Sequence, residues 1–577
     1  MKKKLLPALI VTGLIILVVI IMGITALINK YTPTKKTEDL KEYFNISSDD
    51  EAALIVDNEL SDYKAKIIDK KIYVDYKFVH DSLNSRFYWD ANENVLLYTT
   101  ASDIISAAAD SNSYSVTKQT NDFGYPIVKA TSDSALIALD YVKQYSNITF
   151  KSYDDPARIV ITSKWDEIDS ATVSKSTQVR VKGGIKSPIL KEVKKDDKIT
   201  ILDSGDKWDK VATEDGVIGY IKGKALSESK KTKLTNPDYE EETFTHIKKD
   251  KDICLAWNQV TSQSANSKVP QVISSTKGIN VMSPTWFYLN DNNGNLADIA
   301  SKDYVSYCHS QGIEVWGLFS NLENTDVDAA YVLTHTSTRT TLINQIMSAA
   351  FNYELDGVNI DFENITEAAY GDSYIEFIRE LAIKCHNNGI SLSVDVTVPA
   401  SFNKFFNRSD MANFADYIVI MGYDEHYKGS DAGSVSSIPW VTEGVESTLK
   451  EVPADQIILG MPFYTRIWEL TPKEDDDAVT DTEDQSKYTV ASQVYSMDAA
   501  AAQLATNNAT AALDEESGQN YAEWSASNKL YKVWLEDSTS LEKRLKLVDD
   551  NKLAGAAFWK LGFENSSVWD TVIKYLD

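Results

Sequence analysis

The chain has 577 residues, of which 43% are hydrophobic, 10% aromatic and 25% charged, and its formal net charge is −27. A chain of this length exceeds what one hydrophobic core usually serves, so we expect several domains, and the ordinary apolar content argues against disorder over most of the length. The negative charge would repel phosphate groups and therefore argues against nucleic acid as a partner. A neutral or zwitterionic substrate is compatible with it.

Neither a metal site nor a disulfide framework is indicated. The three cysteines are Cys254, Cys308 and Cys385, and no two of them form a CxxC pair. The six histidines are scattered and form no HExxH pair. We therefore expect three small buried hydrophobes, no metal and no other cofactor.

An apolar run follows the lysines at the N-terminus, from Leu5 to Ile28. As a helix it spans about 36 Å, enough for a hydrocarbon core of about 30 Å. It is longer than the apolar region of a cleaved signal peptide, and no small-residue cleavage motif ends it. We expect residues 1–30 to form a cytoplasmic tip and an uncleaved transmembrane anchor, followed by a solvated linker at 31–50. Lysines flank the run on both sides, so the charges alone do not decide its orientation.

Residues 51–165 contain a weak internal repeat, which predicts an α+β domain. The first copy has a strand at 72–74, a helix bearing Val79 and Leu83, and strands at 87–89 and 95–98. The second copy has the following expected parts: Ile127–Val128, a helix with Ala135, Leu136, Leu139 and Val142, and strands at 148–150 and 159–161. The pattern resembles the domain named after the N-terminal region of copper amine oxidases. Copper itself is not implied, because the region holds one histidine and no cysteine, and we expect a spacer or a wall-contacting module.

Residues 171–228 contain short β-type runs separated by glycine-rich turns, which predicts a small β-barrel. The segment from Trp208 to Tyr220 resembles bacterial SH3-like domains of cell-wall enzymes. Packing in the barrel core and binding of a glycan or stem peptide are both open for these two aromatic residues.

Short β-branched runs alternate with helical stretches over residues 240–577, which is typical of a parallel sheet. The eight expected strands are Ile253–Trp257, Gly278–Met282, Ile313–Phe319, Gly357–Glu363, Ile390–Val396, Tyr417–Met421, Gln456–Met461 and Ala554–Trp559. They predict an α/β fold, a (β/α)₈ TIM barrel with an insertion at about 470–532 between strands seven and eight. The acidic segment 474–484 in this insertion is interpreted as a solvated charge run rather than a metal-binding loop.

Strand four carries the residues that indicate chemistry. Alternate positions of a strand share a face, so Asn359, Asp361 and Glu363 point one way, and apolar residues 358, 360 and 362 point the other way. The apolar set suits the outer helix layer, so the polar set must face the barrel interior. Buried carboxylates are costly without partners, and catalytic residues of such barrels lie at the carboxyl ends of strands. We therefore expect an active site here.

The segment from Asp356 and Gly357 to Glu363 resembles the DxxDxDxE signature of family-18 glycoside hydrolases, the chitinase-like family. Further positions match the family in order: Met421, Tyr423 and Asp424 after strand six, Tyr464 and Arg466 after strand seven, and Trp559 at the end of strand eight. Asn359, together with residues 533–537, resembles the spore-cortex and cell-wall N-acetylglucosaminidase branch.

The resemblance implies substrate-assisted retention, in which Glu363 is the general acid. Asp361 would hold the acetamido N–H of the sugar and Tyr423 would donate to the acetamido oxygen. The implied substrate-binding set is Asn359, Asp424, Met421, Tyr464, Arg466, Trp559 and Trp286, although packing is an equal alternative for Trp286. The signature usually has aspartate where this chain has Asn359, so we expect Asp361 to ionise more readily, and proton shuttling between these two positions is in doubt.

The expected partner is peptidoglycan or another N-acetylated polysaccharide, without nucleic acid, and the oligomeric state is left open. The enzyme interpretation places the C-terminal domains on the cell-wall side of the membrane. A chitinase acting on free polymer and a catalytically silent glycan-binding protein are the two alternatives.

Overall fold

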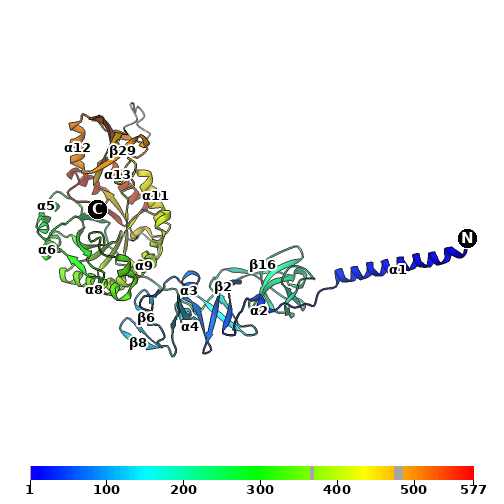
Figure 1. Ribbon diagram of the computed structural model, residues 1–577. Coiled ribbons are helices and arrows are strands. Elements are labelled where there is room, and N and C mark those ends of the chain that lie inside the picture. Colours follow the sequence, from blue (N-terminus) through cyan, green and yellow to red (C-terminus); the bar gives the residue numbers. More distant parts are fainter. Residues whose placement is uncertain (1, 364, 366–369, 474–484, 577) are drawn as a thin grey trace. The chain divides into compact units, whose positions relative to one another are not determined.

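The computed structural model describes residues 2–363, 365, 370–473 and 485–576 (Figure 1). The chain divides into two compact units. Unit 1 comprises Met1–Trp89, Ala107–Tyr114 and Asn121–Glu241, and unit 2 comprises Asp90–Ser106, Ser115–Thr120 and Glu242–Asp577.

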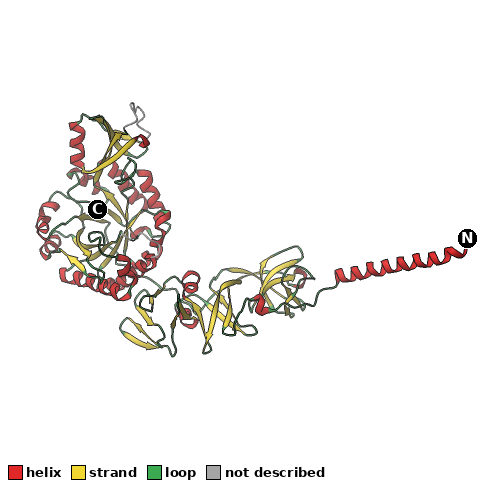
Figure 2. Cartoon of the chain, viewed as in Figure 1, coloured by secondary structure: helices red, strands yellow, loops and turns green. Residues whose placement is uncertain are grey.

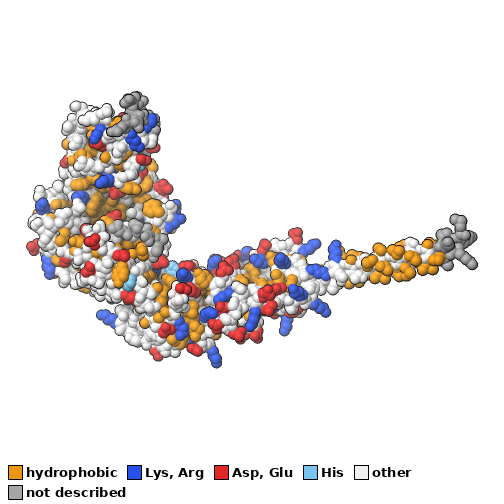
Figure 3. Space-filling model, in the orientation of Figure 1, with side chains coloured by type: hydrophobic (Ala, Val, Ile, Leu, Met, Phe, Trp, Pro, Cys, Tyr) orange, Lys and Arg blue, Asp and Glu red, His pale blue; other side chains and the backbone are white. Residues whose placement is uncertain are grey.

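Helix α1 (Lys2–Tyr31) is the N-terminal apolar segment. Its stretch Pro7–Tyr31 has a mean hydropathy of 2.9, and none of it is buried against the rest of the chain. Figure 3 shows hydrophobic side chains along this helix. Its length and composition are sufficient to cross a membrane.

One sheet of unit 1, which contains the strands of the second copy of the repeat and the first strand of the first copy, has seven strands. Their order is β11 (Thr149–Tyr153), β12 (Arg158–Thr162), β1 (Glu51–Val56), β2 (Glu59–Ile68), β3 (Lys71–Asp75), β10 (Ala135–Ala138) and β9 (Val128–Ala130). A strand–helix–strand–strand order occurs twice along the chain. The first copy runs through β3, α3 (Tyr76–Ser82), β4 (Phe87–Asp90) and β5 (Val95–Thr99), and the second runs through β10, α4 (Leu139–Gln144), β11 and β12.

The predicted helix of the second copy is wrong at its start. Ala135 and Leu136 lie in strand β10, which pairs antiparallel with β3, and α4 begins only at Leu139. The apolar residues of a strand that runs directly into a helix imitate one longer helical face, because no turn residue separates the two elements.

A second seven-stranded sheet covers the predicted SH3-like region. Its order is β15 (Ile189–Val193), β14 (Thr177–Arg180), β18 (Ile218–Lys222), β17 (Trp208–Thr213), β16 (Lys198–Asp203), β13 (Glu167–Thr172) and β19 (Lys230–Lys233). One apolar core joins this sheet to the repeat, because Ala53 and Ile55 pack with Val179 and Val211. Trp208 and Tyr220 are half-buried beside Gly183.

A five-stranded sheet has the order β4, β5, β6 (Ile104–Ala108), β7 (Ser113–Val116) and β8 (Gln119–Asp122).

Unit 2 contains a closed barrel of eight parallel strands, as predicted. In spatial order they are β20 (Ile253–Asn258), β33 (Gly555–Trp559), β27 (Ile457–Pro462), β26 (Tyr417–Met421), β25 (Ser391–Thr397), β24 (Gly357–Asp361), β23 (Glu314–Ser320) and β21 (Val281–Leu289), and β21 pairs with β20 to close the ring. The second strand starts later than predicted, at Val281, because Gly278 has a φ of +77° that lies outside the strand region.

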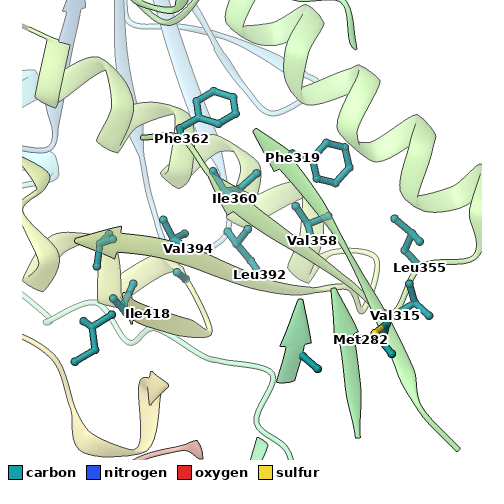
Figure 4. Packing of buried hydrophobic residues seen from close by; sticks show 14 of the residues in the cluster. Met282, Val315, Phe319, Leu355, Val358, Ile360, Phe362, Leu392, Val394 and Ile418 are labelled. Carbon is teal, nitrogen blue, oxygen red and sulfur yellow. The ribbon is translucent and has the colours of Figure 1, made fainter. Parts of the chain in front are cut away.

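Helices surround the strands (Figure 2). The main ones are α6 (Lys302–Ser310), α8 (Thr336–Tyr353), α9 (Gly371–His386), α10 (Arg408–Phe414), α11 (Ile438–Thr448) and α13 (Ser538–Asn551). Val358 and Ile360 of β24, and Phe362 directly after it, pack in the apolar layer beneath these helices, beside Leu392 and Val394 of β25 (Figure 4). The opposite face of β24 therefore points into the barrel, as the alternation predicted. Cys254, Cys308 and Cys385 are buried free thiols, as expected.

The described part of the insertion between strands seven and eight contains a five-stranded antiparallel sheet and the α-helix α12 (Met497–Thr506). The strands are β29 (Tyr488–Ser496), β28 (Tyr464–Pro472), β32 (Lys529–Leu535), β31 (Gln519–Ala526) and β30 (Ala512–Asp514), in this spatial order. The sheet begins at Tyr464, earlier than the predicted 470, because only Phe463 separates β27 from β28. The acidic segment 474–484 lies outside the described residues.

Candidate active site

Asn359 lies at the centre of the barrel and has no exposed surface. Its Oδ1 accepts hydrogen bonds from Trp257 Nε1 at 3.0 Å and Ser283 Oγ at 2.9 Å. Its Nδ2 donates to Ser393 Oγ at 3.0 Å and to Asp395 Oδ1 at 2.7 Å. All hydrogen-bonding positions of the amide are therefore used by side chains of three other barrel strands, β20, β21 and β25. Asn359 supports the site from beneath, and the expected direct contact with a sugar does not fit this placement.

Asp361 and Glu363 follow Asn359 on the same face of the chain. Asp361 ends β24 and is half-buried, and its Oδ1 is enclosed without a hydrogen-bond partner among the described residues. Glu363 is exposed at the barrel opening, and its backbone N–H donates to Asn321 Oδ1 at 3.1 Å. The deeper carboxyl can thus bind a buried polar group, while the outer one can reach a glycosidic oxygen.

The pKa of the Glu363 carboxyl is raised by partial burial, by Asp424 and by Glu323. Its proton is therefore held to higher pH, which suits a general acid. The pKa of Asp361 is raised well above its ordinary value by burial, and next by Asp395 on the adjoining strand. The expectation that Asp361 ionises readily is wrong, because burial disfavours its charged form and Asp395 supplies the like charge that Asn359 lacks.

Asp356 and Gly357 have structural roles at the opposite end of β24. Asp356 Oδ2 accepts hydrogen bonds from the backbone N–H of Val315 and from His309 Nε2, both at 2.8 Å. A Cβ at Gly357 would lie 2.5 Å from the Trp316 ring, so a larger residue would displace this buried side chain.

Aromatic side chains form the floor of the opening. The Tyr423 ring lies 6.4 Å from Trp257 and 6.3 Å from Tyr464, and Trp559 lies 6.0 Å from Trp257, between ring centroids. The pKa of Tyr423 is raised well above its ordinary value by burial and then by Asp361. Its hydroxyl therefore stays protonated and can donate to an acceptor.

Asp424, Tyr464 and Arg466 form a polar group where the insertion joins the barrel. The Tyr464 hydroxyl donates to Asp424 Oδ1, and Arg466 Nη2 lies 3.7 Å from the same oxygen. Met421 is buried at the end of β26 and lines a cavity of about 130 Å³ together with Glu363. The structure thus brings these predicted residues to the same end of the barrel.

Trp286 is placed differently from the other predicted binding residues. It lies within β21, has no exposed surface, donates from Nε1 to Asn266 Oδ1 at 2.7 Å and packs edge-on against Tyr304 at 4.9 Å. It belongs to the outer apolar layer. Trp286 therefore packs in the core and is not a sugar-binding residue.

Sequence reasoning missed Asp395, Trp257, Ser283 and Glu323 at this site. A signal for Asp395 was present, because strand five reads Ser-Leu-Ser-Val-Asp-Val-Thr from 391 to 397 and alternates polar and apolar residues. That alternation places the polar set inside the barrel, next to the polar set of strand four.

Comparison with known proteins identifies the barrel. Residues 321–564 match the model for glycosyl hydrolases family 18. This barrel is a family-18 glycosyl hydrolase domain. The chain thus contains a glycoside hydrolase domain, and the strand-four residues Asn359, Asp361 and Glu363 lie within the matched region.

Two relatives from Bacillus subtilis (strain 168) resemble about half of the chain. The uncharacterized glycosylase YvbX is 24% identical over 301 residues, which cover 49% of this chain and 81% of that protein. The cortical fragment-lytic enzyme is 25% identical over 287 residues, which cover 48% of this chain and 63% of that protein. A C-terminal domain of a chitinase-like protein from Desulfitobacterium hafniense DCB-2 has the same fold, with a TM-score of 0.50 at 18% identity, covering 57% of this chain and all of that domain.

Proposed function

We propose that the family-18 barrel is an N-acetylglucosaminidase that hydrolyses β-1,4 bonds of peptidoglycan with retention of configuration. The observation that carries this proposal is the pair of carboxyls at the carboxyl end of β24, an enclosed Asp361 and an exposed Glu363, beside the Tyr423 hydroxyl. One carboxyl is placed to hold the substrate and the other to exchange protons with it.

In the proposed first step, Glu363 gives its proton to the glycosidic oxygen, and the bond from that oxygen to the anomeric carbon breaks. The carbonyl oxygen of the sugar's own 2-acetamido group attacks the anomeric carbon and forms an oxazolinium ion. Glu363, now a carboxylate, then takes a proton from water, which attacks the anomeric carbon while the bond from that carbon to the acetamido oxygen breaks and the acetamido group is restored. Both displacements invert that centre, so the net result is retention.

Asp361 and Tyr423 act on the acetamido group in this scheme. A carboxylate at Asp361 accepts a hydrogen bond from the acetamido N–H and stabilises the positive charge that develops on the oxazolinium ring. Tyr423 donates to the acetamido oxygen and holds it against the anomeric carbon. In the same scheme, Trp559 forms an apolar floor beneath the sugar, and Asp424, Tyr464 and Arg466 contact neighbouring hydroxyl groups.

Two observations favour peptidoglycan over chitin as the substrate. One relative of the barrel carries the name cortical fragment-lytic enzyme. The N-terminal apolar helix, if it anchors the chain, would keep the barrel next to the cell's own wall, and we propose that residues 31–577 lie outside the membrane. Chitin-like glycans are the second candidate, since they contain the same acetamido sugar.

The proposed cleavage side follows from the chemistry of the two peptidoglycan sugars. N-acetylmuramic acid carries an anionic lactyl ether on O3, next to its acetamido group. A subsite that holds the acetamido group between Asp361 and Tyr423 leaves little room for this neighbour. N-acetylglucosamine therefore occupies the reacting subsite.

Digestion of purified peptidoglycan sacculi by the full-length chain in detergent tests the substrate and the side of cleavage. After borohydride reduction, new glucosaminitol ends are expected. Muramitol ends would contradict the subsite assignment, and activity on N-acetylated chito-oligosaccharides alone would favour the chitin-type alternative.

A further inference from the structure

Strand β25 presents a polar face to the barrel interior that the proposed mechanism has not used. Ser391, Ser393 and Asp395 are all buried on this face, and Asp395 is only 3% exposed. A buried carboxyl is costly unless it is paired, hydrogen-bonded or functional. Asp395 also lines the cavity of about 130 Å³ that Glu363 borders.

The strand register places Asp395 beside Asp361. Asn359 pairs with Ser393 and Ile360 pairs with Val394, so the next positions along both strands are the two aspartates. Neighbouring strands lie about 4.8 Å apart, and both residues belong to inward-facing sets. Two carboxyl groups this close in a buried place cannot both be charged at low cost, so they share one proton.

The hydrogen bonds indicate which carboxyl holds the proton before substrate arrives. Asn359 Nδ2 donates to Asp395 Oδ1 at 2.7 Å, which favours the ionised form of Asp395. Asp361 Oδ1 is enclosed and accepts no hydrogen bond from the described residues. The resting charge therefore lies on Asp395 and the proton on Asp361.

Among the described residues, the titratable groups that interact with this pair are two further carboxyls and two tyrosine hydroxyls. Glu363 lies two residues after the end of β24, and Glu323 lies after β23; both raise the pKa of Asp361. Tyr423 follows β26 and Tyr374 lies on α9, and the pKa of each is raised well above its ordinary value, mainly by burial. Both hydroxyls are therefore neutral over the working pH range, and burial also raises the pKa of Asp395.

We propose that Asp395 is the proton-holding partner of Asp361. When the acetamido N–H of the substrate reaches Asp361, the proton on Asp361 moves to Asp395, directly or through one water molecule, and the negative charge moves to Asp361. The total charge of the pair does not change. The inference rests on the proposed substrate-assisted mechanism, and Asp395 is a positioning residue because it acts through Asp361.

This role accounts for Asn359, the departure from the family signature. The signature has a carboxylate on strand four at this place, whereas this chain has an amide there and a carboxylate on strand five. The hydrogen bond between Asn359 and Asp395 can form equally if the amide and the carboxyl change places. A variant with aspartate at 359 and asparagine at 395 therefore tests whether either position can hold the proton.

The test compares Asp395→Asn with the exchange variant Asn359→Asp/Asp395→Asn. Steady-state rates are measured against pH with the full-length chain in detergent on an N-acetylated chito-oligosaccharide. Asp395→Asn is expected to lower kcat by up to about 10²-fold, because Glu363 then gives up its proton less readily. It also removes a like charge from Asp361, which then stays ionised close to Glu363. The pKa of Glu363 rises, and the alkaline limb of kcat/KM moves to higher pH. The exchange variant is expected to return both kcat and the limb toward the wild-type values.

A structural carboxyl at the other end of the barrel provides the control. Asp416 is buried, and its Oδ2 accepts a hydrogen bond from the backbone N–H of Leu392 at 2.7 Å. Asp416→Asn is expected to lower the unfolding temperature without moving the alkaline limb. A limb that moves equally in this control would overturn the role of Asp395.

Two further results would reject the proposal. One is an Asp395→Asn enzyme with wild-type kcat and an unmoved limb. The other is a folded exchange variant whose kcat and alkaline limb do not return toward the wild-type values. This second result also rejects the proposal if Asp395→Asn alone fails to fold. The proposed function fails separately, if the wild-type chain is inactive on this probe and on sacculi or if Glu363→Gln is as active as wild type.

Discussion

Glu363 shares the barrel opening with other acidic side chains, and these set the pH range in which it can act. Burial, Asp424 and Glu323 all raise the pKa of its carboxyl. A general acid must be protonated to act, so activity is present below this pKa and is lost as the pH rises through it. The alkaline limb of the pH–rate profile therefore reports directly on these neighbouring charges.

Glu323→Gln removes one of these like charges. The pKa of Glu363 is expected to fall, so the alkaline limb of kcat/KM moves to lower pH. The matched control is Glu354→Gln, which makes the same charge change at an exposed residue before the opposite end of β24. A limb that moves equally in both variants, or upward in Glu323→Gln, would contradict this account of Glu363.

Asp361→Asn and Tyr423→Phe remove the two groups that act on the acetamido group. Each is expected to lower kcat roughly 10²–10³-fold, the size of the loss when one donor to a developing charge is removed. Both keep the shape of the side chain, so the unfolding temperature is expected to change little. The account fails for either residue whose variant turns over substrate at the wild-type rate.

At the scale of elements, the insertion sheet is fixed to the barrel by a buried ion pair. Arg544 of α13 donates to Glu536 from Nη1 at 2.6 Å and from Nη2 at 2.8 Å, and neither side chain is more than 1% exposed. Gln519 of β31 donates to the same carboxylate at 2.7 Å. One buried network thus joins the insertion sheet to a barrel helix.

Arg544→Ala leaves the Glu536 carboxylate buried without its charged partner. Breaking a buried pair in this way costs about 3–5 kcal/mol. The denaturation midpoint of the transition that reports on the barrel is expected to fall accordingly, whereas Lys546→Ala at an exposed position of the same helix is expected to leave it unchanged. Equal midpoints for Arg544→Ala and wild type would show that the pair does not hold the insertion.

The elements with a strong hydrophobic periodicity could be predicted from the sequence. The boundaries that depend on strand pairing in the folded chain could not. The eight barrel strands were predicted from short apolar runs between helical stretches, and the two faces of β24 from the alternation of polar and apolar residues. The boundary between β10 and α4 was not predicted, because Ala135 and Leu136 suit both a strand and the helix that follows. The start of the insertion at Tyr464 was missed because no turn residue separates it from β27.

In the active site, too, residues close together in the chain could be predicted, and residues brought together by the fold could not. The signature from Asp356 to Glu363 could be found in one strand because its residues are adjacent in the chain. The partners of Asn359 come from three other strands, and sequence spacing alone does not give the register that places Asp395 beside Asp361. The orientation of Trp286 was also undecided by sequence, because a bulge in β21 changes which side chains face outward.

At the scale of the whole molecule, the proposed arrangement is a membrane anchor followed by two small modules and a catalytic barrel. Helix α1 is long and apolar enough to cross a membrane. The resemblances of residues 51–165 and 171–228 to wall-associated modules stay predictions. Their half-buried Trp208 and Tyr220 are compatible with packing and with a role at the surface.

The anchor predicts that the intact chain stays in the membrane fraction of cells that express it, and that deletion of residues 2–31 releases it. Protease added to intact protoplasts is expected to degrade most of the full-length chain. Full protection from the protease would show the opposite orientation, and recovery of a shortened chain in the medium would show that the helix is a cleaved signal.

Glu363→Gln is the measurement that tests the central claim most directly. The amide keeps the size of the side chain but has no proton to transfer, and general-acid catalysis contributes roughly 10²–10⁴-fold. The full-length variant is expected to fold and to bind N-acetylated glycan like the wild type, while kcat falls by about that factor. A variant that retains near wild-type kcat would remove Glu363 from its role and contradict the proposed mechanism.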